Sequence, residues 1–200
     1  MLPSFRWFCG VALVAMLLIV GCDGGAPKFK NIDLTGAEYA KGFSLTDHNG
    51  KARTLADFQG KVVVIFFGFT RCPDVCPTTM VELKEALRKL GPDAERVQVL
   101  FVTLDPDRDT PEVLAQYVPS FDPRFLGLYG DNATTQRTAK DFKIFSEKRP
   151  GASPDNYTID HSAASYVFDP TGRLRLYVKP DKTGSIVDDI RTLLKEQPQK

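Results

Sequence analysis

The chain carries a pair of cysteines, Cys72 and Cys76, whose types and spacing allow chemistry. They are separated by Pro-Asp-Val and directly follow the apolar run Val62–Phe69. Two thiols at this spacing can form a disulfide, act as a redox pair or hold a soft metal ion such as Cu(I). A structural disulfide is the least favoured, because closing so short a loop constrains little of the unfolded chain. Spacing alone does not decide between the other two.

The two histidines of the chain therefore matter, since an imidazole added to two thiolates suits Cu(II) as well as Cu(I). His48 lies in a polar turn beside Asn49-Gly50, and we expect an exposed turn residue there. His161 lies just before the apolar run Ala163–Phe168, where it can reach the two sulfurs. From the residues alone, His161 is either a ligand or base, or a buried, hydrogen-bonded histidine.

Several elements are predicted to position these residues. Asn49-Gly50 marks the tip of a hairpin, and the run from Val62 has no alternation, which is typical of a strand buried on both faces. Thr79 and Glu82 fit a capping box for the helix that follows the cysteines, and Gly91-Pro92 ends that helix. The other predicted elements are strands at 97–104 and 125–129, helices at 110–118, 132–142 and 185–195, and a hairpin at 163–168 and 174–178.

This order of elements predicts an α/β domain with a thioredoxin-like fold. A central mixed sheet is flanked by helices, with an N-terminal β-hairpin extension and an insertion before the last hairpin. The fold puts Cys72 at a strand exit and Cys76 near a helix N-terminus, where backbone N–H groups favour a thiolate. Arg71 adds a positive charge beside Cys72.

The first residues resemble a lipoprotein signal. Residues 1–21 combine Arg6 with an apolar stretch that is short for a membrane span of about 20 residues, although an uncleaved anchor is the alternative. Cys22 is then the lipidated residue, residues 22–41 a lipidated linker, and residues 42–200 the folded domain. Cys9 is lost with the leader. Asp23 resembles a signal for retention in the inner membrane, so we expect a lipid anchor on its periplasmic face.

The charge of the chain argues against nucleic acid as a partner. Without Arg6 the basic side chains fall from 26 to 25, which equals the number of acidic ones. A balanced charge offers no electrostatic attraction for a phosphate backbone. About 160 residues are enough for one domain with its own core, so disulfides are not needed for folding.

Three segments resemble the SCO1/SenC/PrrC family. They are GFTRCPDVCPTT at 68–79, VTLDPDRDTP at 102–111 and DHSA at 160–163. Members of this family are membrane-tethered thioredoxin-like proteins that bind copper and help to load the binuclear copper site of cytochrome c oxidase. The resemblance implies that Cys72, Cys76 and His161 are metal ligands that hold Cu(I) and Cu(II).

The resemblance also concerns the residues around these ligands. The acidic loop with Asp105, Asp107 and Asp109 borders the site in the family, where it helps to organise the site or docks a partner. The alternative is a solvated loop that caps the next helix, which alone accounts for Asp109. This chain has Arg71 where many relatives have histidine.

The expected partners are the copper-site subunit of the oxidase and another periplasmic copper carrier or a thiol reductant. The lipid is also expected to bind the membrane.

The main alternative function is a thiol–disulfide oxidoreductase, in which Cys72 and Cys76 are the redox-active pair. The metal-carrier interpretation has no catalytic residue. A peroxidase is disfavoured, because the chain has Thr-x-Cys instead of Thr-x-x-Cys. A redox or copper sensor would need a partner, since the chain has no output domain.

Overall fold

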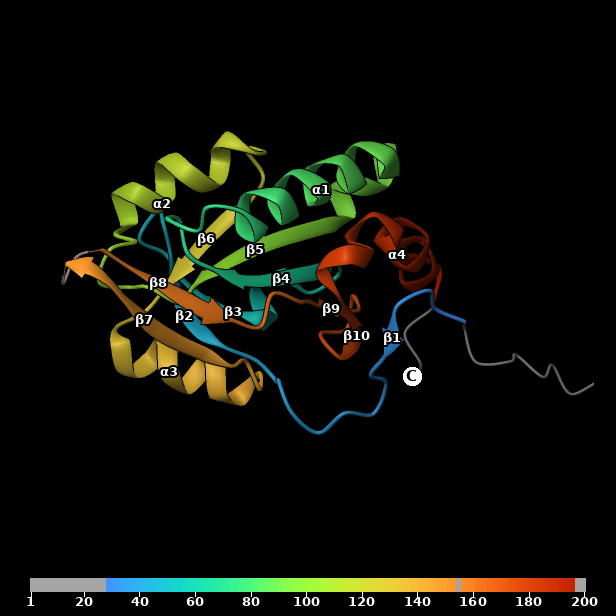
Figure 1. The fold of residues 1–200 in the computed structure, drawn as a ribbon. Coiled ribbons are helices and arrows are strands. Elements are labelled where there is room, and N and C mark those ends of the chain that lie inside the picture. The colour runs from blue at the N-terminus through green and yellow to red at the C-terminus, as the bar shows by residue number, and fades with distance from the viewer. Residues whose placement is uncertain (1–27, 154–155, 197–200) are drawn as a thin grey trace, which may run out of the picture.

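The protein is described by a computed structural model that covers residues 28–153 and 156–196. Figure 1 shows one central sheet with helices on both faces and a separate hairpin at one end. The strands are β1 (Ile32–Asp33), β2 (Ser44–Asp47), β3 (Ala52–Thr54), β4 (Val62–Gly68), β5 (Val97–Thr103), β6 (Leu126–Tyr129), β7 (Ser146–Ser153), β8 (Asn156–His161), β9 (Ser165–Phe168) and β10 (Leu174–Val178). The helices are α1 (Val75–Leu90), α2 (Pro111–Tyr117), α3 (Asn132–Asp141) and α4 (Ile186–Lys195).

The main sheet is mixed, as predicted. Its strand order is β1-β10-β9-β4-β5-β6-β2-β3, with β4, β5 and β6 parallel and the other pairs antiparallel. The parallel part is built from strand–helix–strand units, and the ends of the sheet come from hairpins. Cys72 and Cys76 follow the central strand β4, so the rigid middle of the sheet positions them.

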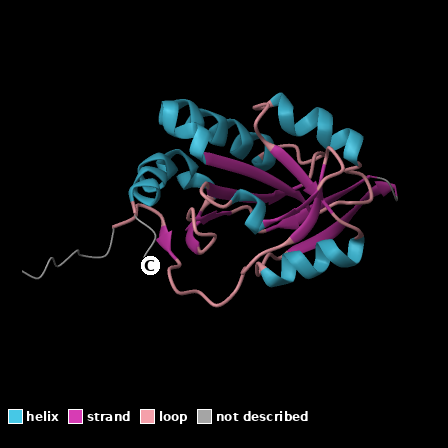
Figure 2. Cartoon of the chain, turned by 180° about the vertical axis from the view of Figure 1, so that it is seen from behind, coloured by secondary structure: helices cyan, strands magenta, loops and turns pink. Residues whose placement is uncertain are grey.

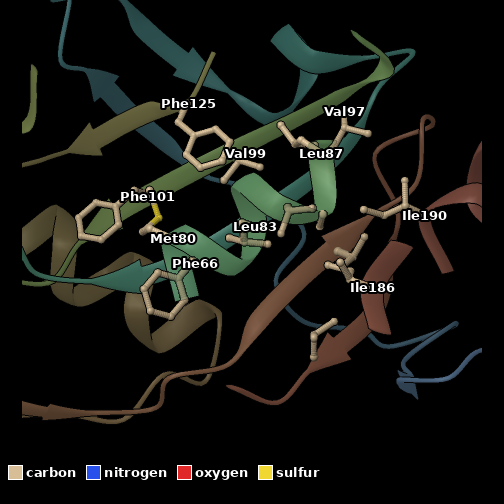
Figure 3. Close-up of a cluster of buried hydrophobic side chains, with 14 of the residues drawn as sticks. Phe66, Met80, Leu83, Leu87, Val97, Val99, Phe101, Phe125, Ile186 and Ile190 are labelled. Atoms are coloured by element: carbon tan, nitrogen blue, oxygen red, sulfur yellow. The ribbon is translucent and has the colours of Figure 1, made fainter. Parts of the chain in front are cut away.

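Strand β4 is buried on both faces, as its unbroken apolar sequence predicts. Val62, Val64 and Phe66 face a core that is covered by α1, α2 and α4. Val63, Ile65 and Phe67 face a second core on the α3 side. Figure 2 shows the same layering from behind, with helices above and below the strands. The first core is drawn in Figure 3, where Met80, Leu83 and Leu87 of α1 point at the sheet.

Two details of the prediction were wrong at helix α1. The helix begins at Val75, with Asp74 as an N-cap residue whose side chain makes no capping bond. Thr79 and Glu82 therefore lie inside the helix instead of forming a capping box, and Thr79 is only 2% exposed. The predicted end is correct, because Gly91 follows Leu90 with φ +62° and ends the helix.

Part of the segment predicted as a linker packs on the domain. Strand β1 pairs with β10, and the backbone N–H groups of Lys30 and Asn31 donate to the carboxylate of Asp189 at 2.8 and 3.0 Å. Asp189 is buried, and its carboxylate holds the segment before β1. The apolar periodicity of α4 does not predict this contact. Packing therefore starts well before residue 42. The predicted signal segment, Cys9 and Cys22 lie outside the described residues.

None of the helices in residues 28–153 and 156–196 is long and apolar enough to cross a bilayer.

Candidate metal centre

Cys72, Cys76 and His161 come together at the end of strand β4. Their two sulfurs and the His161 imidazole nitrogen all lie within 4.8 Å of one another. The Cys76 Sγ is 3.6 Å from His161 Nε2, and the Cys76 backbone N–H donates to Cys72 Sγ at 3.4 Å. Both cysteines are free thiols in the structure. Two sulfurs and one imidazole nitrogen at this spacing form a soft three-donor set.

The protonation state of His161 suits a ligand. Its Nδ1 lies 3.0 Å from the carbonyl oxygen of Ser162, which can only accept, so Nδ1 carries the hydrogen and Nε2 presents its lone pair to the sulfurs. Burial lowers the pKa of His161. The rings of Phe66 and Phe69 pack around the imidazole, with centroids 6.4 and 5.9 Å away. His161 is therefore both half-buried and hydrogen-bonded, with one nitrogen left for a ligand.

The Cys76 thiol differs from the prediction. It lies in the first turn of α1, where helix N–H groups were expected to favour a thiolate. Its side chain is fully buried, however, and burial raises the pKa of Cys76 well above its usual value. Cys72 is only half-buried. The two sulfurs thus have different access to solvent.

Gly68, the last residue of β4, makes room for the Cys76 sulfur. A Cβ atom built on Gly68 would lie 2.8 Å from Cys76 Sγ and 3.0 Å from the rings of both Phe66 and Phe101. No side chain fits there without moving the sulfur or a packed ring. No sequence pattern indicates this role, because the contact arises only when α1 folds back on the strand.

Asp109 fastens the loop that carries Cys72. It is 1% exposed, and it accepts hydrogen bonds from the Thr70 backbone N–H at 3.0 Å, the Thr70 hydroxyl at 2.6 Å and the Thr103 hydroxyl at 2.6 Å. The helix-capping explanation of Asp109 was wrong, since Thr110 is the N-cap of α2. Asp109 instead ties the β4–α1 loop to the end of β5.

The alternative prediction of a solvated acidic loop is also wrong for Asp105 and holds for Asp107. Asp105 is fully buried and accepts from Arg108 Nε and from the hydroxyl of Tyr157, both at 2.5 Å. Only Asp107 is a surface group, and it pairs with Lys148 at 2.6 Å. Tyr157 and Lys148 both belong to the β7–β8 hairpin. The acidic loop therefore helps to position the hairpin whose last residue is His161.

The predicted insertion is the hairpin β7–β8. Ser146 pairs with His161 at its base, so the hairpin holds the histidine in its last position. Every residue of β7 is exposed, which leaves no apolar alternation to predict it from. The guanidinium of Arg108 lies 3.5 Å from the Tyr157 ring centroid and the Lys148 amine 4.8 Å from it, so both cations stack on one ring.

The remaining candidate residues lie away from the three donors. His48 is half-buried instead of exposed, and its Nδ1 accepts the Gly127 backbone N–H at 3.0 Å, which fastens the β2–β3 turn to β6. Arg71 is exposed beside Cys72. The role of Gly68 beside the Cys76 sulfur was missed from the sequence.

Comparisons with known proteins all point to one family for this chain. The SCO1/SenC family model matches residues 33–195. The chain is 39% identical over 152 residues to the mitochondrial SCO2 homolog of Mus musculus, which covers 74% of this chain and 60% of the mouse protein. The chain spans only 56–60% of the length of the mammalian SCO2 proteins that it matches.

Two solved structures share the fold over most of the chain. Apo Sco1 of Thermus thermophilus is 43% identical with a TM-score of 0.74, over 85% of this chain and 99% of that one. Copper-bound ScoI of Bradyrhizobium japonicum is 39% identical with a TM-score of 0.70, over 76% of this chain and 97% of that one. With a matching family model, matching relatives and the predicted fold, the chain belongs to the SCO1/SenC family.

Proposed function

We propose that this chain is a copper carrier in which Cys72, Cys76 and His161 bind the metal. The observation that carries the proposal is the convergence of two sulfurs and one imidazole nitrogen within 4.8 Å. Thiolate sulfur is a soft donor suited to Cu(I), and the imidazole extends the set to Cu(II). A relative with copper bound, ScoI of Bradyrhizobium japonicum, supports this choice of metal.

Each of the three proposed ligands has a different role when copper binds. His161 needs no proton removed, because it is neutral and its Nε2 already faces the sulfurs. Cys76 is buried and holds its proton until a metal replaces it, so loading releases protons. Cys72 is half-buried, and it is the sulfur that an incoming protein reaches first. Copper therefore enters and leaves by ligand exchange on the Cys72 side.

The recipient we propose is the copper-site subunit of cytochrome c oxidase. Membership of the SCO1/SenC family supports it, and the exposed position of the hairpin beside His161 leaves the site open to a protein partner. A periplasmic copper carrier as donor completes the cycle.

A copper titration tests the ligand assignment. The reduced domain is titrated with Cu(I) and Cu(II) in competition with a chelator, as wild type, Cys72→Ser and His161→Ala, with His48→Ala as the matched control. We expect one copper per chain for wild type and His48→Ala. Loss of a donor should weaken binding about 100-fold or more in the other two. Equal affinity in all four proteins would contradict the assignment.

A thiol–disulfide oxidoreductase is the second candidate, and the unequal exposure of the two cysteines favours it. The half-exposed Cys72 would attack a target disulfide to form a mixed disulfide, and Cys76 would then displace the target thiol. The step oxidises the pair to a disulfide and reduces the target to two thiols, so an external reductant must restore the pair. Rapid catalytic reduction of a disulfide substrate, without retention of copper, would favour this function over the carrier.

We also propose that Cys22 is lipidated and that the lipid holds the domain at the periplasmic face of the inner membrane. The sequence pattern around Cys22 supports this, and a SCO1/SenC lipoprotein of Bacillus anthracis is a structural relative. Labelling of cells with a radioactive fatty acid should mark the wild-type chain and leave Cys22→Ser unlabelled.

A further inference from the structure

A groove lies between α3 and the β7–β8 hairpin. Two adjoining hollows of about 370 and 460 Å³ form it, and both are lined by Gln136, Ala139 and Ser146. Figure 1 shows α3 on the opposite side of the sheet from α1 and α2. None of the three proposed metal ligands lines the two hollows, so the groove is a separate feature of the surface.

Part of the groove lining is apolar. Leu104, Ala139, Ile144 and Ile159 line it, together with Phe145, which is 56% exposed to solvent. Single exposed apolar residues are ordinary, but Phe145 continues an apolar lining that is already hollowed. The groove therefore offers apolar surface that another molecule can cover.

The charged side chains of the groove are mainly basic. Lys140, Lys143 and Lys148 line it, and the acidic residue among them, Glu147, pairs with Arg149 at 3.0 Å. Lys148 already has a carboxylate partner. Lys140 and Lys143 form no ion pair within the described part of the chain. An acidic partner would complement these two charges.

Lys143 has an unusual backbone conformation for a lysine. It follows α3 and its C-cap residue Phe142 with φ +55°, in the left-handed region where helices usually end in glycine. A side chain in this region costs free energy, so folding alone would favour glycine. The Lys143 ammonium lies 4.0 Å from the ring centroid of Tyr39, which offsets part of the cost. Contacts of the side chain, and not backbone geometry, must account for the lysine.

One end of the groove adjoins the residues paired with the proposed metal centre. The Phe145 carbonyl accepts the backbone N–H of Ser162 at 3.0 Å, and the Phe145 N–H donates to the Ser162 hydroxyl at 3.2 Å. The next residue, Ser146, pairs with His161. A molecule that covers Phe145 and Ser146 therefore contacts the two residues that are paired with His161 and Ser162.

We propose that this groove binds an acidic segment of the protein that exchanges copper with the chain. Carboxylates of the segment pair with Lys140 and Lys143, and its apolar side chains fill the hollows beside Phe145. Two hollows side by side suit successive side chains of a peptide. Opposite charges speed the encounter of two proteins and fix their register, so docking here holds the partner beside His161. That the partner is a copper protein rests on the proposed function, whereas the docking itself does not.

Peptide selection tests the docking site. An unbiased library of displayed peptides is selected against the metal-free protein, and the affinities of the selected peptides are then measured by titration. We expect these peptides to combine acidic and apolar residues, and we expect their binding to shift the amide signals of α3 and residues 144–148. The double variant Lys140→Gln/Lys143→Gln should bind them about tenfold more weakly, because two ion pairs are lost. The matched control is Lys84→Gln/Lys89→Gln, which removes two exposed lysines from α1.

Two further variants separate docking from folding. Phe145→Ser should bind the selected peptides about tenfold more weakly, because it removes apolar surface from the groove. Lys143→Gly suits the backbone at φ +55°, so the urea midpoint of unfolding should be unchanged or higher. The same variant should still weaken peptide binding about threefold, since it removes one cation.

Other results would overturn the docking site. Selected peptides that are basic or uncharged would do so, as would equal affinities in wild type and Lys140→Gln/Lys143→Gln. Equal weakening in the α1 control would reduce the effect to overall charge. A lower urea midpoint in the double variant, with unchanged binding, would assign the two lysines to stabilising the end of α3 through the helix dipole. The assay contains no copper, so its failure would leave the copper titration, and with it the proposed function, unaffected.

Discussion

At the scale of single residues, Cys76 and His161, two of the proposed ligands, are held in protonated and neutral form in the absence of metal. Burial holds the proton on Cys76, and the Ser162 carbonyl fixes the hydrogen of His161 on the nitrogen that points away. At this site copper would compete with the proton on the buried Cys76 sulfur and with no proton on the imidazole Nε2. Such a site should bind metal reversibly, which suits a carrier better than a permanent metal enzyme.

Gly68→Ala tests how closely the fold fits the Cys76 sulfur. The added methyl would lie 2.8 Å from the sulfur and 3.0 Å from two packed rings, so one of them must move. We expect a loss of about 1–3 kcal/mol in the free energy of unfolding and a clear loss of copper affinity. Chemical denaturation and copper competition measure the two effects. The control is Gly42→Ala, where nothing lies within 4 Å of the new atom; equal copper affinity in both variants would contradict the role of Gly68.

The residues that the sequence revealed at the site share one property. Cys72, Cys76 and His161 were found because their chemistry is unusual in itself and their segments resemble a family. Gly68 acts through its close packing against the Cys76 sulfur and the rings of Phe66 and Phe101, and glycine is an ordinary residue type. Such roles depend on where packing brings an atom, which spacing and composition do not encode.

At the scale of elements, the β7–β8 hairpin carries His161, a proposed ligand, and of its described residues only Ile159 is buried in the core. Its strands pair with each other and not with the main sheet. Polar contacts add to this packing, since Arg149 pairs with Asp160 across the strands and Lys148 reaches Asp107. Ion pairs that are exposed to water contribute little individually, so we infer that Ile159 and Tyr157, which lies beside two cations and donates to Asp105, are the main anchors.

Tyr157→Ala should therefore loosen the hairpin. It removes the ring under Arg108 and the bond to Asp105, together worth about 1–2 kcal/mol. We expect amide hydrogen exchange in β7 and β8 to quicken about tenfold while β4 and β5 are unchanged. Tyr157→Phe, which keeps the ring, should lie between this variant and wild type. Unchanged exchange in Tyr157→Ala would show that other contacts anchor the hairpin.

The elements with a core face were predictable, and those without one were not. Strand β4 and helix α1 show their burial as apolar runs and periodicity, and their bounds were close to those observed. Strands β7 and β1 have no buried residue and are held by strand pairing and polar contacts, such as the bond to Asp189 from the backbone N–H of Asn31, next to β1. Apolar sequence patterns indicate which residues are buried. They therefore do not predict strands that are held by pairing and polar contacts.

At the scale of the whole molecule, the two hairpins of the main sheet close with the same turn. Asp47 and Asp169 are both buried, and one oxygen of each accepts two backbone N–H groups of its own turn. Gly50 and Gly172 follow three residues later, each with φ +81°, which favours glycine. The described chain starts beside α4, at the end of the molecule away from the β7–β8 hairpin (Figure 1).

These turns should make the protein sensitive to acid. Burial alone would raise the pKa of Asp169, but bonds from Thr171, Arg173 and Arg175 outweigh it and hold the pKa below its ordinary value. Hydrogen bonds from Lys51, Arg53 and Asn49 do the same for the pKa of Asp47. A depressed carboxyl pKa stabilises the fold fully above the unfolded value of about 4, and that stability is lost as pH falls through the folded value.

Urea unfolding of the metal-free domain between pH 6 and pH 2.5 checks this sign. Wild-type stability should stay nearly level down to about pH 4 and then fall. Asp169→Asn should cost about 1–3 kcal/mol at pH 6, because the bonds to Arg175 and the turn lose their charge, and this cost should shrink as the wild-type carboxyl is protonated. Asp141→Asn is the control, because Asp141 is exposed, and it should follow wild type. A penalty in Asp169→Asn that is equally large at pH 2.5 would mean that the turn depends on shape and not on charge.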